Sequence, residues 1–316
     1  DVGGGVFVNI EGNSADSAVV LGKSGSQDLT VTTKGVALYG TVQSGPWYKT
    51  ATSDADNWAY LQNKQGGPAV EVRGGTLTIY GGTYTAAQGE GVLVKNGSVD
   101  IYGGTFVGAD AYNAYGGGDH AGPAASYAFK VFGGQARVYD GTFGTTQDRG
   151  SGAFVMGTSS VTATAEIYGG TFKVSGQAGF SVCEYADLLF DPTSSAILVS
   201  GNACGIAVEN RNAHTSIVIN GGTFESTGKN GSYDGVWFSN TQATMTITGG
   251  TFIGSARSGL YFQLSPGWRK VQISGGKFNR SGNNLPIAGS YSQYSVIAAG
   301  YRLDTSNPSS WQVVAN

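Results

Sequence analysis

The chain has 316 residues, of which 53 are glycine, 12 % are charged and 40 % are hydrophobic, a composition too apolar for an intrinsically disordered protein. Its formal net charge of −3 argues against a nucleic-acid partner, because phosphate binding requires a basic surface. No run of about 18 apolar residues occurs, which excludes a membrane-spanning helix.

The N-terminal part of the chain is predicted to be a short cap followed by an insertion. The sequence starts at Asp1 without a methionine or a signal peptide, so we expect a processed or excised part of a longer protein. Residues 1–28 are predicted to form the cap or the first coil of a repeat array. Residues 43–67 form an insertion in which Trp47 and Trp58 lie near acidic residues, a combination typical of carbohydrate sites.

An eight-residue motif then recurs seven times and defines the repeat. It ends in an aromatic residue, and the spacings between these aromatics are 22, 37, 29, 52, 28 and 26 residues. The spacing of 52 fits two periods of 26, with a degenerate copy in "DLLFDPTSSAILVSG". The copies are "LTIYGGTY" (77–84), "VDIYGGTF" (99–106), "ARVYDGTF" (136–143), "AEIYGGTF" (165–172), "IVINGGTF" (217–224), "MTITGGTF" (245–252) and "VQISGGKF" (271–278).

A second motif runs in phase with the first and consists of a small residue followed by alternating apolar residues. Examples are "GVLVK" (91–95), "GAFVM" (152–156) and "GLYFQ" (259–263). Each period therefore holds two or three short strands separated by glycine turns, and no segment has helical spacing.

Short strands in periods of about 20 to 30 residues predict a solenoid, because one coil cannot bury its own apolar face. We expect one all-β domain over residues 1–316, a single-stranded right-handed parallel β-helix of about nine or ten coils. The repeats would span 29–278, with insertions at 43–67 and 108–126, and residues 279–316 would form a C-terminal cap. One interior ladder would contain the apolar residues Ile79, Ile101, Val138, Ile167, Ile219, Ile247 and Ile273.

The repeats, with the closing segment "VIAAGYRLDTSNPSSWQVV" (296–314), resemble the pectin-lyase-like group of right-handed parallel β-helix proteins. More narrowly, they are similar to Gly-Gly-Thr-Phe repeat regions of surface or secreted proteins of gut bacteria. The resemblance covers roughly residues 29–315 and implies an extracellular or cell-surface location. It leaves the function open, because β-helices carry lyases, glycosidases and adhesins alike.

If the repeats stack in phase, outward positions form columns along the rod. The residue before the glycine pair gives a tyrosine column that could present aromatic area to a sugar, or could be an ordinary exposed ladder. The second motif gives two further columns, in which Phe132, Phe154 and Met156 would form an apolar patch, and Trp237 and Tyr261 another. Such patches mark a contact surface or a covering loop. The tyrosine column comprises Tyr80, Tyr102, Tyr139 and Tyr168.

Two later insertions add candidate ligand residues. Residues 108–126 lengthen one coil and carry Tyr112 and Tyr115, while residues 225–235 carry Tyr233 and Asp234. These residue types stack on sugar rings and bind hydroxyl groups, although they are also common in turns.

Candidate catalytic residues are scattered singly along the chain. A glycosidase needs two carboxyl groups about 5 to 9.5 Å apart, which Asp119 with Asp148, or Glu184 with Glu209, could provide on adjacent coils. A lyase could use Glu209, Arg211 and His214, and His120 adjoins Asp119. No metal, Ca²⁺-repeat or nucleophile motif occurs, so we expect neither a metal ion nor a cofactor.

Three functions follow from these patterns. The preferred one is a non-catalytic carbohydrate-binding or adhesive rod whose partner is a glycan or polysaccharide. The alternatives are a glycoside hydrolase or polysaccharide lyase with its site on the face from Lys130 to Glu209, and a structural stalk. The sequence does not define the oligomeric state. The two cysteines, Cys183 and Cys204, are expected about 16 Å apart along neighbouring strands, and therefore as free thiols.

Overall fold

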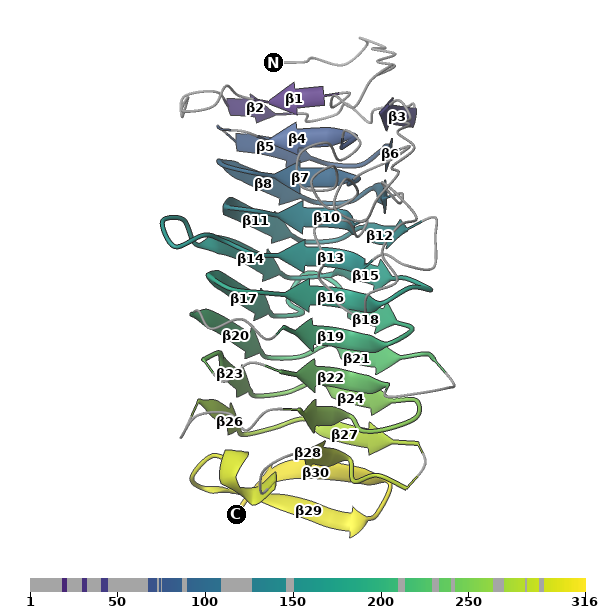
Figure 1. The fold of residues 1–316 in the computed structure, drawn as a ribbon, viewed down its shortest axis with the longest axis vertical. Helices are drawn as coiled ribbons and strands as arrows, with labels where there is room; N and C mark the ends of the chain where they lie inside the picture. The colour runs from purple at the N-terminus through teal and green to yellow at the C-terminus, as the bar shows by residue number, and fades with distance from the viewer. Residues whose placement is uncertain are drawn as a thin grey trace, which may run out of the picture.

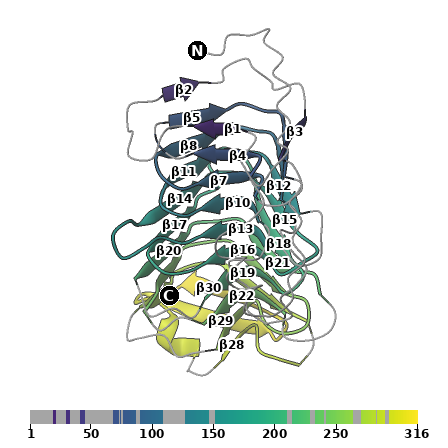
Figure 2. The same ribbon diagram turned by 45° about the horizontal axis from the view of Figure 1, so that its top comes forward.

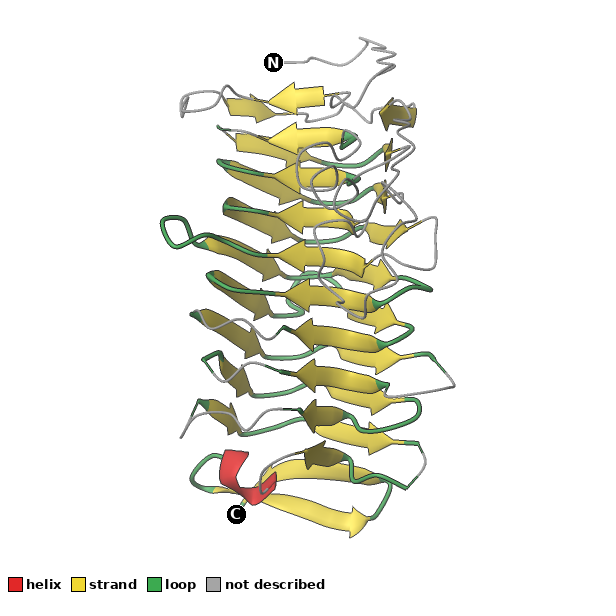
Figure 3. Ribbon diagram, in the orientation of Figure 1, coloured by secondary structure: helices red, strands yellow, loops and turns green. Residues whose placement is uncertain are grey.

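The protein is described by a computed structural model, which covers residues 19–21, 30–32, 41–44, 68–72, 74, 76–86, 90–108, 127–145, 151–209, 214–228, 233–239, 242–263, 270–281, 283–289 and 293–316. In these ranges nearly all regular structure is β, and one short 3-10 turn, η1 (Gln293–Val296), lies near the C-terminal end (Figure 3). No helix of the described residues has the length and apolar character needed to cross a membrane.

The described strands form three sheets that run the length of the molecule. Sheet I contains β1 (Val19–Leu21), β4 (Val70–Val72), β7 (Val92–Val94), β10 (Tyr127–Val131), β13 (Ser151–Val155), β16 (Ala178–Val182), β19 (Cys204–Val208), β22 (Asp234–Phe238), β25 (Leu260–Phe262) and β28 (Ile287–Gly289). Sheet II contains β2 (Thr30–Thr32), β5 (Thr76–Ile79), β8 (Ser98–Ile101), β11 (Gly134–Val138), β14 (Ala163–Ile167), β17 (Ala186–Phe190), β20 (Thr215–Ile219), β23 (Thr244–Ile247) and β26 (Val271–Ile273). Sheet III contains β3 (Thr41–Ser44), β6 (Thr83–Ala86), β9 (Thr105–Gly108), β12 (Thr142–Thr145), β15 (Gly170–Lys173), β18 (Ile197–Gly201), β21 (Thr223–Ser226), β24 (Thr251–Gly254), β27 (Lys277–Arg280), β30 (Ser310–Ala315) and β29 (Tyr301–Asn307).

Each coil contributes one strand to each sheet, and that strand pairs in parallel with its counterpart in the next coil. Figure 1 shows the resulting stack from the N-terminal to the C-terminal end, and Figure 2 shows the sheets arranged around a common interior. The chain is therefore an all-β parallel β-solenoid, which confirms the predicted fold class but not the predicted count of nine or ten coils.

Two interior ladders confirm the phase of the repeat. The apolar residue before the tyrosine position forms one column in sheet II, and the aromatic residue that closes the motif forms another in sheet III. Each buried phenylalanine of the second ladder contributes about 1.5–3 kcal/mol by removing its side chain from water. The aromatic ladder is Tyr84, Phe106, Phe143, Phe172, Phe224, Phe252 and Phe278, all buried.

The degenerate coil exchanges the two residue sizes between these ladders. Phe190 pairs with Ile167 and Ile219 in sheet II, and Val199 pairs with Phe172 and Phe224 in sheet III. The Phe190 ring lies 5.0 Å from the Phe224 ring, edge to face, so it fills space that the smaller Val199 leaves. The interior volume is thus conserved in a coil that lacks the motif.

The glycine pair of the motif forms the corner between sheets II and III. Its second glycine has positive φ, for example 135° at Gly141, a conformation that residues with a side chain rarely adopt. The first position does not have positive φ, and Asp140 occupies it in one copy. In other copies neighbouring backbone leaves no room for a side chain, for example at Gly249, where a Cβ would lie 2.4 Å from the carbonyl oxygen of Asn220.

The C-terminal end of the rod is closed by an antiparallel hairpin. Strand β30 pairs with both β27 and β29, and Trp311 lies opposite Phe278 and is almost fully buried. The hairpin covers the edge of β27, which would otherwise expose unpaired backbone groups.

Both cysteines are free thiols, as predicted, and both are buried. Cys204 pairs with Ala178 in the parallel register, which places it five residues along the strand direction from Cys183.

Candidate functional site

One surface of the rod combines aromatic, charged and hydroxyl side chains. We call it the tyrosine face, meaning the outer surface of β5, β8, β11 and β14 in sheet II and the tyrosines that follow these strands. Alternation along each strand directs every second residue outward, and the parallel register aligns these residues in three columns. The first column is Thr76, Ser98, Gln135 and Thr164, the middle one is Thr78, Asp100, Arg137 and Glu166, and the last is Tyr80, Tyr102, Tyr139 and Tyr168.

The four tyrosine rings form a continuous stack. Successive ring centroids lie 5.2, 4.5 and 5.2 Å apart, and the rings are within 17° of parallel. Tyr80 and Tyr102 are 40 % and 44 % exposed. Because the rings cover one another's faces, the ladder presents ring edges and hydroxyl groups to solvent. A flat stacking surface, one of the expectations from sequence, is therefore limited to the two ends of the stack.

An ion pair occupies the middle column. The Arg137 Nε and Nη2 groups donate to the two carboxylate oxygens of Asp100 at 2.7 and 3.1 Å, and Glu166 lies on the other side of Arg137 in the register. Partial burial lowers the pKa of Arg137, but the charge and hydrogen bonds of Asp100 outweigh it, so the pKa is raised. The carboxylate of Glu166 accepts a hydrogen bond from the Tyr168 hydroxyl at 3.1 Å.

The pKa values of two tyrosines of the ladder are raised. The pKa of Tyr102 is raised by loss of solvent, then by Tyr139 and by the Asp100 charge. The pKa of Tyr168 is raised by loss of solvent, then by the hydrogen bond to Glu166 and its charge.

A hollow of about 560 Å³ lies at the opposite ends of the same four strands. Hydroxyl and amide groups line it, and the Thr76 and Ser98 hydroxyls are hydrogen-bonded at 2.9 Å. Val161, in the loop that projects beside β14 in Figure 1, forms one wall. Such a lining offers hydrogen-bond donors and acceptors without a net charge, which suits a polyhydroxylated ligand.

Glycines beside the hollow let neighbouring coils approach closely, and they were not predicted from the sequence. Gly134 has a φ of 77°, and a Cβ there would lie 2.6 Å from the carbonyl oxygen of Gly97. The signal was present, because "NGS" (96–98) and "GGQ" (133–135) occupy equivalent positions of successive repeats.

The hollow and the tyrosine ladder therefore lie at opposite ends of the same four strands and form one continuous surface with the residues between them. Four residues separate Thr76 from Tyr80, or ~13 Å along the strand, and three strand intervals give ~14 Å along the rod. The tyrosine column continues into the C-terminal half of sheet II, but its residues there are not aromatic. They are Asn220, Thr248 and Ser274.

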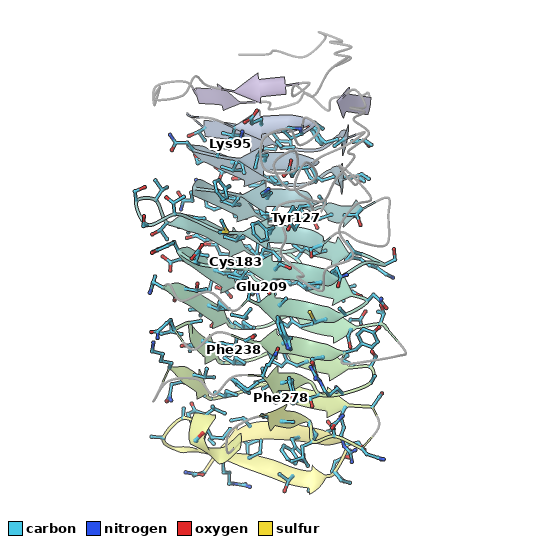
Figure 4. The ribbon with its side chains drawn as sticks, in the orientation of Figure 1. Lys95, Tyr127, Cys183, Glu209, Phe238 and Phe278 are labelled. Atoms are coloured by element: carbon cyan, nitrogen blue, oxygen red, sulfur yellow. The ribbon has the colours of Figure 1, made fainter. Side chains whose placement is uncertain are left out.

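The outer face of sheet I has the predicted columns but is largely buried. Lys130 and Glu209 are each 8 % exposed, and Phe154 is buried against Tyr127, with ring centroids 4.7 Å apart. The Lys130 ammonium donates to Glu90 at 3.0 Å. Figure 4 shows Tyr127, Cys183 and Glu209 on this face. Of the predicted apolar patch, Phe154 is buried, whereas Phe132 and Met156 are partly buried.

The described catalytic candidates do not form one cluster with His214. Glu209 adjoins Cys183 in the register of β16 and β19, one residue from Glu184. The His214 Nε2 atom instead lies 3.4 Å from Asp187 in an exposed pair on sheet II. Asp119, His120, Asp148 and Arg211 lie outside the described residues.

Among the ligand candidates near the C-terminal end, Asp234 has a structural role. It is fully buried and accepts hydrogen bonds from the Arg257 guanidinium and, at 3.0 Å, from the Ser258 backbone N–H. Burial raises the pKa of Asp234, although Arg257 opposes this. Arg257 also lies 3.5 Å from the ring centroid of Tyr261.

Of the remaining aromatic ligand candidates, three are described by the structure and four are not. Tyr233 and Trp237 are partly buried against Cys204 and neighbouring alanines, and Trp237 pairs with Tyr261 across β22 and β25. Trp47, Trp58, Tyr112 and Tyr115 lie outside the described residues.

Comparison with known proteins adds no relative. No protein-family model matches the chain, and no curated protein or solved structure has significant similarity to it. In the part of the chain that the structure describes, no three His, Cys, Asp or Glu side chains are grouped as metal ligands would be.

Proposed function

We propose that this chain is a non-catalytic carbohydrate-binding β-helix, secreted or displayed on a bacterial surface, that binds glycans on the tyrosine face. We also propose that the chain is related to the pectin-lyase-like β-helix proteins and to Gly-Gly-Thr-Phe repeat regions of bacterial surface or secreted proteins. The observation that carries it is the four-tyrosine ladder, in which Tyr80 and Tyr102 are exposed. The ladder is bordered by the middle column, which contains two carboxylates and Arg137, and by a hollow lined with hydroxyl and amide groups.

These groups match the chemistry of a sugar. The tyrosine hydroxyls exchange hydrogen bonds with sugar hydroxyls, the ring faces at the two ends of the stack pack on C–H groups, and carboxylates accept hydrogen bonds from pairs of hydroxyls. The solenoid holds all of them on rigid strands, so little side-chain freedom is lost on binding. The enzyme alternative has less support, because Lys130 and Glu209, on which it depends, are each 8 % exposed.

A glycan array followed by calorimetry tests the proposal. We expect the chain to bind a subset of glycans, and Tyr102→Ala with Tyr139→Ala to weaken binding at least tenfold, because both rings lie inside the ladder. The matched control is Thr246→Ala with Thr248→Ala, on the same sheet beyond the ladder.

Two outcomes would contradict it. Absence of binding across plant, host and microbial glycans would remove the function, and an equal loss in the control would place binding elsewhere. Release of reducing ends or of unsaturated uronates from a bound polysaccharide would favour the enzyme alternative.

A further inference from the structure

The tyrosine face and the adjoining coil are strongly acidic. Among the described side chains, five carboxylates and one guanidinium lie along the tyrosine ladder and the middle column, so these groups together have a net charge of −4 with His214 neutral. Lys95, next to the hollow, is bound to Glu71 at 2.8 Å. The carboxylates belong to Asp100, Asp140, Glu166, Asp187 and Asp191.

The one guanidinium among these described side chains is paired with a carboxylate. Asp100 holds Arg137 through two hydrogen bonds, and Glu166 lies on its other side. Asp100 uses the Nε and one Nη2 donor of Arg137, so a carboxylate or sulfate bound to the remaining N–H groups would lie close to the negative charges of Asp100 and Glu166. The raised pKa values of Tyr102 and Tyr168, to which these two carboxylates contribute, agree with a negative local field.

Resting on the proposed function, we infer that the tyrosine face selects neutral or amino-bearing glycans and rejects glycans that carry uronate or sulfate. Hydroxyl groups donate to the carboxylates, whereas an anionic substituent meets like charges and, among the side chains described in the hollow, no cation. The carboxylates thus act as specificity residues by repulsion as well as by hydrogen bonding.

Calorimetry with matched oligosaccharides tests the inference. The probes are cello-oligosaccharides, the same chains oxidised to uronates at C6, and oligomers of glucosamine and of N-acetylglucosamine. We expect the uronate chain to bind at least tenfold more weakly than its neutral counterpart at low salt, with a smaller ratio at high salt because screening weakens the repulsion.

Variants assign the effect to the face. Glu166→Gln with Asp191→Asn should narrow the neutral-to-uronate ratio several-fold, whereas Glu225→Gln, a carboxylate on the outside of sheet III, should not change it. Equal or tighter binding of the uronate chain, or an unchanged ratio in the double variant, would overturn the inference and leave the proposed function standing. Absence of binding by every probe, including the best glycan from the array, would remove both.

Discussion

At Gly82 the backbone has a φ of 107°, in the region that only glycine adopts without strain. Its neighbour Gly81 does not have positive φ, and a Cβ there would meet no atom within 4 Å. The two glycines of one corner are therefore held to different requirements. Another copy of the motif is consistent with this difference, because Asp140 stands at the first glycine position while Gly141 retains the second.

We predict that Gly82→Ala lowers the free energy of unfolding by about 1–3 kcal/mol, the cost of a residue forced into an unfavourable φ. Gly81→Ala, its matched control, should change it by no more than about 0.5 kcal/mol. Urea unfolding followed by circular dichroism measures both. Equal losses in the two variants would refute the conclusion that positive φ at Gly82 is what restricts this corner.

The tyrosine ladder also depends on individual residues whose role the sequence could not define. Its existence follows from the repeat spacing, and the structure confirms the alignment. The orientation of the rings does not follow, because stacking of Tyr102 on Tyr139 is a property of side-chain rotamers, which a spacing does not determine.

At the scale of the coil, the unit that must be conserved is the interior volume rather than the motif. The coil of β17 and β18 exchanges its ladder residues, with Phe190 in the isoleucine column and Val199 in the phenylalanine column. Phe190 contacts Phe180 and Phe224 edge to face, so the aromatic packing passes through it.

We predict that Phe190→Ile and Val199→Phe each destabilise the protein by about 1–3 kcal/mol, one through a cavity and the other through overpacking. The double variant restores the arrangement of neighbouring coils, so its loss should be smaller than the sum by about 0.5–3 kcal/mol. Chemical denaturation of the four proteins gives this coupling. Val199→Phe combined with Phe106→Ile, three strands away, should be additive, and equal coupling in both pairs would refute the exchange.

Some features of the coils could be predicted from the sequence and others could not. The interior ladders could be predicted, because period-two alternation and a repeat of fixed phase determine which residues face inward. The burial of Lys130 and Glu209 could not, because an outward position in a strand is exposed only if no distant segment covers it. The glycines that line the hollow, Gly97 and Gly134, were not predicted, because they lie outside the Gly-Gly-Thr motif that defines the repeat.

At the scale of the whole molecule, stacking places ionisable groups in a dry interior. Tyr84 begins the described aromatic ladder, is buried, stacks on Phe106 with ring centroids 4.9 Å apart, and donates a hydrogen bond to the Gly81 carbonyl at 2.9 Å. Burial raises its pKa to about 12. Burial likewise raises the pKa of Tyr127 well above its usual value.

These shifts predict the alkaline limit of the fold. An unfolded tyrosine loses its proton near pH 10, whereas Tyr84 in the folded chain keeps it to about pH 12. The unfolded state therefore binds fewer protons in this window, and stability that is fully present below pH 10 falls as the pH rises through 12. Tyr84 alone accounts for a loss of up to about 3 kcal/mol.

Urea unfolding at intervals from pH 8 to pH 12, with and without Tyr84→Phe, measures this contribution. Phenylalanine cannot ionise, so the variant should be less stable than the wild type by a constant amount below pH 10, through loss of the hydrogen bond to Gly81. Above pH 10 the difference should shrink, because only the wild type continues to lose the Tyr84 term. If the two curves stay parallel to pH 12, the Tyr84 hydroxyl reaches solvent in the folded state, and the interior of the N-terminal coils is wetter than its packing implies.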